Sequence, residues 1–152
     1  MPGINDLLPR ERTPADYLRL VDDPRAGQET LRALAVSPYN FVRSAVADSP
    51  RADASTMAAI PLADLDPWTR NHILAAIAHH PNADRSTLLQ TLHTVAELLE
   101  QPGERPYAAA LSLARRPELT AAEVLTLAAR RNASRRMIRG LRRALAASRR
   151  TL

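Results

Sequence analysis

The sequence predicts an all-α chain that is built from repeated pairs of helices. Four prolines mark equivalent points of the repeat: Pro24, Pro50, Pro81 and Pro117. The residues four and three places before each proline are apolar, as in a helix with one buried side: Leu20 and Val21, Val46 and Ala47, Ile77 and Ala78, and Leu113 and Ala114. No run of alternating apolar and polar residues predicts a β-strand. Because each pair of helices can bury its apolar stripe only against its neighbours, we expect a short α-solenoid.

The residue three places after each proline is suited to begin a second helix. These residues are Gly27, Asp53, Asp84 and Thr120. Three of the four carry a side-chain oxygen that can accept a hydrogen bond from the free amides of a first helical turn. Apolar residues follow at seven and at ten or eleven places after each proline: Leu31 and Leu34, Met57 and Ile60, Leu88 and Leu92, and Val124 and Leu127. This spacing indicates one buried stripe on each second helix.

A further set of prolines marks where the later units begin, because proline at the first position of a helix loses no needed donor. They are Pro38, Pro67 and Pro106. We expect about four helix pairs and a C-terminal capping helix, spanning residues 14–22 and 28–36, 39–48 and 54–63, 67–79 and 85–100, 106–115 and 121–131, and 134–148. Residues 1–13 are then an N-terminal tail, residues 14–148 a single solenoid domain, and residues 149–152 a C-terminal tail.

One unit resembles the leucine-rich variant repeat, whose units read V-R-x-x-V-A-x-x-P, and more loosely the HEAT-like repeats. It runs from Val42 through Arg43, Val46 and Ala47 to Pro50. The arginine is replaced in the other units, by Tyr17, Leu74 and Ala110. The resemblance implies a right-handed superhelix in which some second helices are short or of the 3₁₀ type. Some relatives bind an iron–sulfur cluster through cysteines, which this chain lacks, so the resemblance implies a fold and no activity.

The composition excludes several kinds of chemistry. The chain has no cysteine, so it has no thiolate metal ligand, thiol nucleophile or disulfide. Every basic residue is arginine, which excludes a Schiff-base lysine or a Walker lysine. The glycines are isolated, so no glycine-rich phosphate loop exists. A chain of 152 residues can bury enough surface to fold without such staples.

The four histidines are the ordinary acid–base candidates near neutral pH: His72, His79, His80 and His93. His72, His79 and His93 form a conceivable zinc site, but they lack the ligand spacing of known sites. We favour the interpretation that His79 and His80 face solvent at a helix end. The single tryptophan, Trp68, is expected to close the gap over the neighbouring helix pair. We predict no catalytic residue, metal or cofactor, and therefore no enzymatic activity.

The net charge of +5 is concentrated near the C-terminus. Residues 1–114 carry 10 arginines and 14 acidic residues, a net charge of −4, whereas residues 115–152 carry 11 arginines and two acidic residues, a net charge of +9. The expected apolar stripe of the last helix is Ile138, Leu141 and Leu145, with Met137 and Ala144 at its edge. Arginines flank this stripe, with Arg135, Arg139 and Arg142 on one side and Arg136, Arg143 and Arg150 on the other.

We therefore expect a non-enzymatic, cytoplasmic module that binds an unidentified protein with an acidic surface. The predicted partner-binding residues are Arg130, Arg131, Arg135, Arg136, Arg139, Arg142 and Arg143. The alternative is sequence-independent nucleic-acid binding through phosphate contacts, with Arg115 and Arg116 added to that set. An acidic membrane surface is a further alternative. In a last interpretation the arginines are only the solvated face of a terminal helix. The longest aliphatic run, Ile73–Ala78, is far shorter than the roughly 20 residues of a transmembrane helix, so we expect no transmembrane segment.

Overall fold

The computed structural model describes residues 2–150, with side chains described as far as Ser148, and this part of the chain is helical without β-strands. The helices are α1 (Ile4–Leu7), α2 (Pro14–Val21), α3 (Gln28–Ala35), α4 (Asn40–Asp48), α5 (Ala54–Ala58), α6 (Pro67–His79), α7 (Arg85–Leu98), α8 (Tyr107–Ala114), α9 (Ala121–Leu125), the 3₁₀ helix η1 (Thr126–Ala129) and α10 (Arg135–Arg150). The all-α prediction is confirmed. One turn of helix, α1, lies within the segment expected to be a tail.

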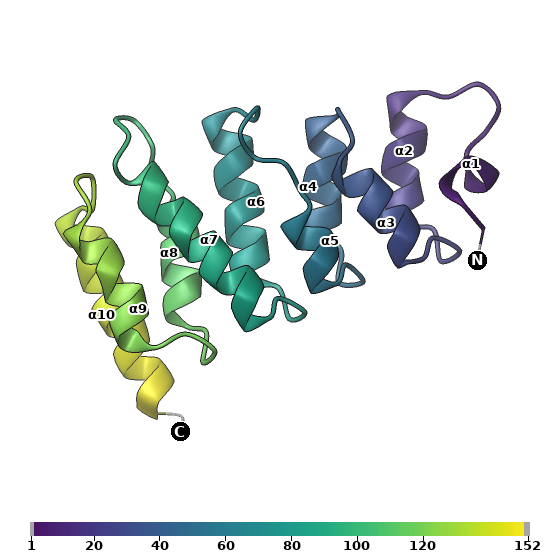
Figure 1. Ribbon diagram of the computed structural model, residues 1–152. Coiled ribbons are helices and arrows are strands. Elements are labelled where there is room, and N and C mark those ends of the chain that lie inside the picture. Colours follow the sequence, from purple (N-terminus) through teal and green to yellow (C-terminus); the bar gives the residue numbers. More distant parts are fainter. Residues whose placement is uncertain (1, 151–152) are drawn as a thin grey trace.

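The helices form two layers that follow the order of the chain (Figure 1). In the first layer α2, α4, α6, α8 and α10 pack each against the next. In the second layer α3 packs against α5, α5 against α7, and α7 against η1. The helices α1 and α10 consequently lie at opposite ends of an elongated molecule (Figure 1).

The core lies between the two layers, at the positions that the repeat predicts. The paired residues before the four prolines are buried, as are Leu31, Met57, Leu88 and Val124 on the second helices. The predicted caps are also confirmed. The side chains of Asp53 and Asp84 each accept a hydrogen bond of 2.8 Å from the backbone amide three residues later, and Thr120 accepts one of 3.1 Å.

The second helices all end earlier than predicted, and the difference is largest for two of them. Helix α5 ends at Ala58 rather than residue 63, because Pro61 disfavours helical geometry at the residue before it. Ile60 is nevertheless buried in the core. The predicted helix 121–131 divides into α9 and η1, and η1 places Leu127 in the core.

The buried stripe of α10 is rotated from the predicted one. Met137, Leu141 and Ala144 are buried, whereas Ile138 and Leu145 are only half-buried. Gly140 explains the rotation, because a Cβ atom there would lie 2.7 Å from Cδ2 of Leu111 in α8. The absence of a side chain lets α8 approach α10 closely on this side. Ile138 is therefore left beside the arginines.

The proline turns are joined by side chains that bind the carbonyls of the preceding turn. Arg51 donates to the carbonyl oxygens of Asp23 and Ala26, and Arg116 donates to those of His80 and Ala83, at 2.7 and 2.9 Å. The side-chain amide of Asn82, in the turn at Pro81, donates hydrogen bonds of 3.0 Å to the carbonyl oxygens of Pro50 and Ala52 in the preceding turn. These contacts fix each unit against the one before it.

The structure corrects the expected exposure of His80 and Arg116. His80 is only 4% exposed; its Nε2–H donates to the Ser49 carbonyl at 2.7 Å, and its Nδ1 accepts from the backbone N–H of Asn82 at 3.0 Å. Arg116 is largely covered, because it binds the carbonyls of the preceding turn and pairs with Glu118 at 2.7 Å. Both residues therefore serve the fold.

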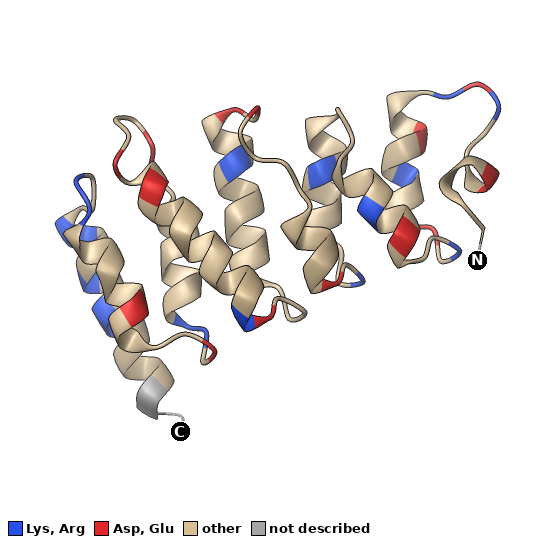
Figure 2. Cartoon of the chain, viewed as in Figure 1, with Lys and Arg blue, Asp and Glu red and all other residues tan. Residues whose placement is uncertain are grey.

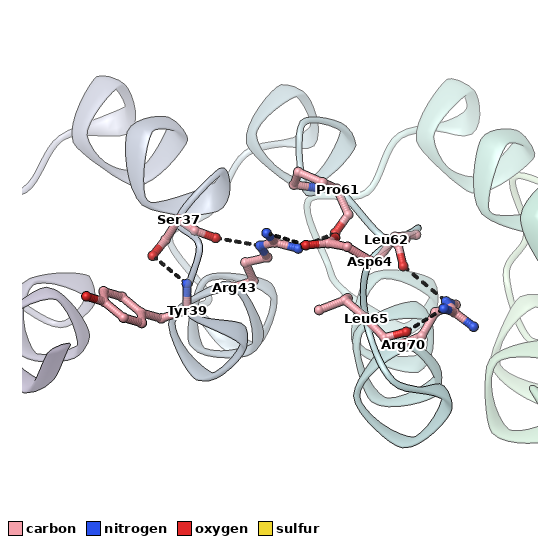
Figure 3. Close-up of polar contacts among 8 residues, drawn as sticks. All are labelled: Ser37, Tyr39, Arg43, Pro61, Leu62, Asp64, Leu65 and Arg70. Carbon is pink, nitrogen blue, oxygen red and sulfur yellow. Dashed lines mark hydrogen bonds and ion pairs between the residues drawn. The ribbon is translucent and has the colours of Figure 1, made fainter.

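At the opposite end of the units, Arg43 of α4 joins the loop before α4 to the loop between α5 and α6 (Figure 3). Its side chain is 6% exposed, and it donates to the Ser37 carbonyl at 2.6 Å and to the Pro61 carbonyl at 3.1 Å. The same guanidinium holds both carboxylate oxygens of Asp64, at 2.8 and 3.1 Å. These hydrogen bonds lower the pKa of Asp64 below its ordinary value.

In the next unit Arg70 binds the loop carbonyls in the way that Arg43 does. The alignment on the prolines had matched Arg43 with Leu74 instead. Arg70 donates to the carbonyls of Leu62 and Leu65 (Figure 3) and to Oε1 of the buried Glu104 at 2.8 Å. Arg43 and Arg70 both occupy the fourth position of their helices, but α6 is about one turn longer than α4. Counting back from the proline therefore missed the equivalence.

Candidate functional site

The last helix presents a set of exposed arginines that we call the arginine surface. It consists of Arg135, Arg136, Arg139, Arg142 and Arg143. None of these guanidinium groups forms an ion pair or hydrogen bond with another residue in the described part of the chain. Figure 2 shows basic residues gathered at this end of the molecule, whereas elsewhere isolated acidic and basic residues occur together, many of them at helix ends and in turns.

The other predicted binding arginines differ from this set. Arg130 is half-buried, and its Nη1 lies 3.6 Å from Oε1 of Glu100. Arg131 is exposed in the turn before α10, and Arg115 is exposed at the end of α8. Arg116 is held by the turn contacts described above, which removes it from the candidate binding residues. The side chain of Arg150 lies outside the described residues.

A groove between α8 and α10 runs along the arginine surface. Its lining combines charged and apolar side chains: Tyr107, Leu111, Arg136, Met137, Arg139, Gly140 and Arg143. On the neighbouring side of α10, Arg135 and Arg139 flank the half-buried Ile138. Because no acidic side chain lines either region, the local potential is positive and favours anionic groups.

A second candidate site, which the sequence analysis did not identify, is an open groove over α2, α4 and α6. Its apolar lining consists of Leu18, Phe41, Ala45 and Trp68, and its polar lining of Asn40, Ser44, Asp48, Thr69 and His72. We call it the aromatic groove. Trp68 is 79% exposed and Phe41 is 45% exposed. The expectation that Trp68 closes the gap over a neighbouring helix pair is therefore wrong.

The walls of the aromatic groove are ordered by contacts between rings. On one side Phe41 stacks against Tyr39, with ring centroids 5.6 Å apart, and Tyr39 contacts Tyr17 at 5.9 Å. On the other side Trp68 stacks against His72 at 6.2 Å. Nε2 of His72 in turn lies 2.9 Å from Oδ2 of Asp48, which links α6 to α4. The exposed indole therefore packs against a histidine ring that is itself paired with Asp48.

The aromatic groove does not have the geometry of a catalytic triad. Ser44, His72 and Asp48 all line it, but the Ser44 hydroxyl makes no hydrogen bond to either nitrogen of His72. A nucleophilic serine needs such a bond to lose its proton. The groove therefore lacks this arrangement for acyl transfer.

The structure also leaves the conceivable zinc ligands apart. His72 pairs with Asp48, and His93 pairs with Glu97 on its own helix at 3.0 Å. Among the described residues, no three histidine or acidic side chains are placed to hold a metal ion.

The pattern of exposed residues did contain a signal for the aromatic groove. Trp68 and His72 are four residues apart on α6, and Phe41 and Ala45 have the same spacing on α4, so each pair shares one helix face. Both faces contain rings, yet spacing alone does not show whether a face is covered by another helix.

Comparisons with known proteins find no match, whether with family models, with curated proteins or with solved structures. Within residues 2–150, no helix combines the length and the apolar composition needed to cross a membrane. The functional argument therefore depends on the two surfaces.

Proposed function

We propose that the chain is a non-enzymatic, cytoplasmic protein-interaction module. In this proposal it is a short right-handed α-solenoid, related to the leucine-rich variant repeats, whose arginine surface binds an acidic segment of a partner protein. The observation that carries the proposal is the set of five exposed arginines on α10 without an acidic partner. Like charges at this spacing repel and destabilise the helix, and an acidic partner relieves that repulsion.

The apolar residues among the arginines favour a protein over a nucleic acid. Leu111 and Tyr107 line the groove beside Arg136 and Arg143, and Ile138 lies between two arginines. Protein interfaces combine an apolar centre with a polar rim and are enriched in arginine and aromatic residues. Phosphate binding requires no such apolar groups.

The layered arrangement supports the solenoid part of the proposal. Each first helix packs on the next first helix, and the second helices do the same, so each unit contacts mainly its neighbours. Repeat proteins of this kind offer an extended surface for binding.

Selection from a displayed library of random peptides tests the proposal. Wild-type protein should enrich peptides rich in Asp and Glu, and a variant with Arg135, Arg139 and Arg142 changed to Glu should not retain them. The control is Arg10→Glu with Arg105→Glu, which reverses two exposed arginines outside α10 that form no ion pair with a described residue. It should bind the same peptides as wild type. Enrichment without acidic residues would contradict the proposal.

A nucleic-acid partner is the second candidate, and the uncompensated charge of α10 together with Arg131 favours it. Binding to random-sequence DNA and RNA duplexes should then fall steeply between about 50 and 200 mM salt and vanish in the triple Glu variant. Such a result, without selection of acidic peptides, would assign the arginines to phosphate contacts.

A further inference from the structure

The arginine surface and the aromatic groove open on the same face of the molecule. On α6 the exposed or half-exposed residues Trp68, His72, Ala75 and His79 lie opposite the buried Ile73 and Ile77. On α8 the corresponding row is Ala108, Leu111, Ser112 and Arg115. Leu111 in this row lines the groove along α10, so the row connects the two sites.

The surface between the two sites is made of small side chains. Ala75 and Ala76 of α6 and Ala108 and Ser112 of α8 are exposed or half-exposed there. Bulkier residues stand at either end, with Trp68 on one side and Arg136 and Arg143 on the other. The larger exposed residues His79 and Arg115 lie at the C-terminal ends of α6 and α8, to one side of these small residues.

We propose that one continuous segment of the partner protein occupies both sites, with an apolar side chain in the aromatic groove and acidic residues against the arginine surface. This inference rests on the proposed function and adds the chemistry of the bound segment. The apolar lining of Leu18, Phe41 and Trp68 suits an aliphatic or aromatic anchor.

Helix packing sets the distance between the two parts of the segment. The aromatic groove lies between α4 and α6, and the other groove between α8 and α10, so two helix spacings separate them. Packed helices lie about 8–10 Å apart, which places the sites about 16–20 Å from each other. An extended chain advances about 3.3 Å per residue. The anchor should therefore lie about six residues from the nearest acidic cluster, or about twelve if the segment is helical.

Trp68 provides a direct test, because it is the only tryptophan in the chain. A peptide whose apolar residue fills the aromatic groove removes water from the indole, and the emission of Trp68 should shift to shorter wavelength. Peptides taken from the library selection serve as probes. Those that carry both an anchor and acidic residues at the stated spacing should produce the shift, and shortened peptides without the anchor should not.

Variants separate the two sites. Trp68→Ala should weaken binding of the selected peptides about tenfold or more, as expected for a central aromatic residue of an interface. Val36→Ala is the matched control, because Val36 is 53% exposed and lies at the end of α3 in the second layer. Thermal melting should show that both variants remain folded. Arg139→Glu with Arg143→Glu should also weaken binding, but saturating peptide should still shift the emission of Trp68.

The outcomes distinguish this inference from the proposed function. Acidic peptides without an anchor, which bind wild type and Trp68→Ala equally and leave the emission unchanged, would overturn the inference and leave the proposed function standing. Selected peptides without acidic residues, or no enrichment at all, would overturn both.

Discussion

Two groups of arginines in this chain do different work. Arg43, Arg51, Arg70 and Arg116 lie in or beside the turns, where they bind backbone carbonyls of neighbouring segments. The five arginines of the arginine surface on α10 bind no described residue and face solvent. The comparison teaches that a guanidinium with several donors can replace missing backbone partners in a loop. Where no carbonyl or carboxylate is offered, its donors remain available to a partner.

The largest expected loss of stability comes from the buried face by which α10 packs on the rest of the protein. Leu141→Asp should lower the free energy of unfolding by about 4 kcal/mol, because it buries an unpaired charge in the core. Ile138→Asp should cost less than about 1 kcal/mol, since the new carboxylate lies beside Arg135 and Arg142 at helical spacing. Urea denaturation of both variants measures the difference. Equally large losses would show that Ile138 belongs to the buried stripe together with Leu141.

Arg70→Met tests the arginines of the turns. It should destabilise the fold by about 3 kcal/mol, because it leaves the buried Glu104 carboxylate without its charged partner and frees the carbonyls of Leu62 and Leu65. Adding Glu104→Met should recover much of this loss, since no lone charge is then buried. A double variant as unstable as Arg70→Met would assign the effect to the carbonyls.

Arg115 and Arg116 provide the comparison at adjacent positions. Arg116→Ala should cost about 2 kcal/mol, because the carbonyls of His80 and Ala83 lose their donors. Arg115→Ala should stay within about 0.5 kcal/mol, as for an exposed side chain without a partner. Chemical denaturation of the two variants under one set of conditions checks this. Similar losses of stability in the two variants would show that the carbonyl-binding arginines do not differ from the exposed ones.

Arg85 lies between the groups, because it is exposed but paired with Glu123 at 2.8 Å. Hydrogen bonds from Arg85 and the Thr120 amide lower the pKa of Glu123 from 4.5 to about 2. This lowered pKa stabilises the fold fully above about pH 4.5, and the stabilisation is lost as pH falls toward 2. Stability measured from pH 6 to 2 should therefore fall more steeply in wild type than in Glu123→Gln. Parallel curves would contradict this role of Glu123.

The sequence contained enough to predict the helices, their caps and the core, because these depend on spacings within one unit. Asp53, Asp84 and Thr120 cap as expected, and the residues before each proline are buried. His80 was misplaced because its burial depends on a carbonyl 31 residues earlier. The expectation for Trp68 was wrong for a similar reason, because its exposure depends on how α6 packs beside α4, which is again a contact between two units. Contacts between units are not visible in the pattern of a single unit.

One substitution on α10 should change stability in the opposite direction. Arg139 has arginines three and four residues away in both directions, at positions 135, 136, 142 and 143. Arg139→Glu replaces four repulsive pairs by attractive ones, so it should raise the free energy of unfolding by about 1 kcal/mol at low salt. Added salt should shrink the gain through screening. Denaturation at two salt concentrations measures it, and a loss of stability would show that Arg139 has a structural role. A gain in stability together with weaker peptide binding would show that the repulsion among the α10 arginines destabilises the helix but serves binding of the acidic partner.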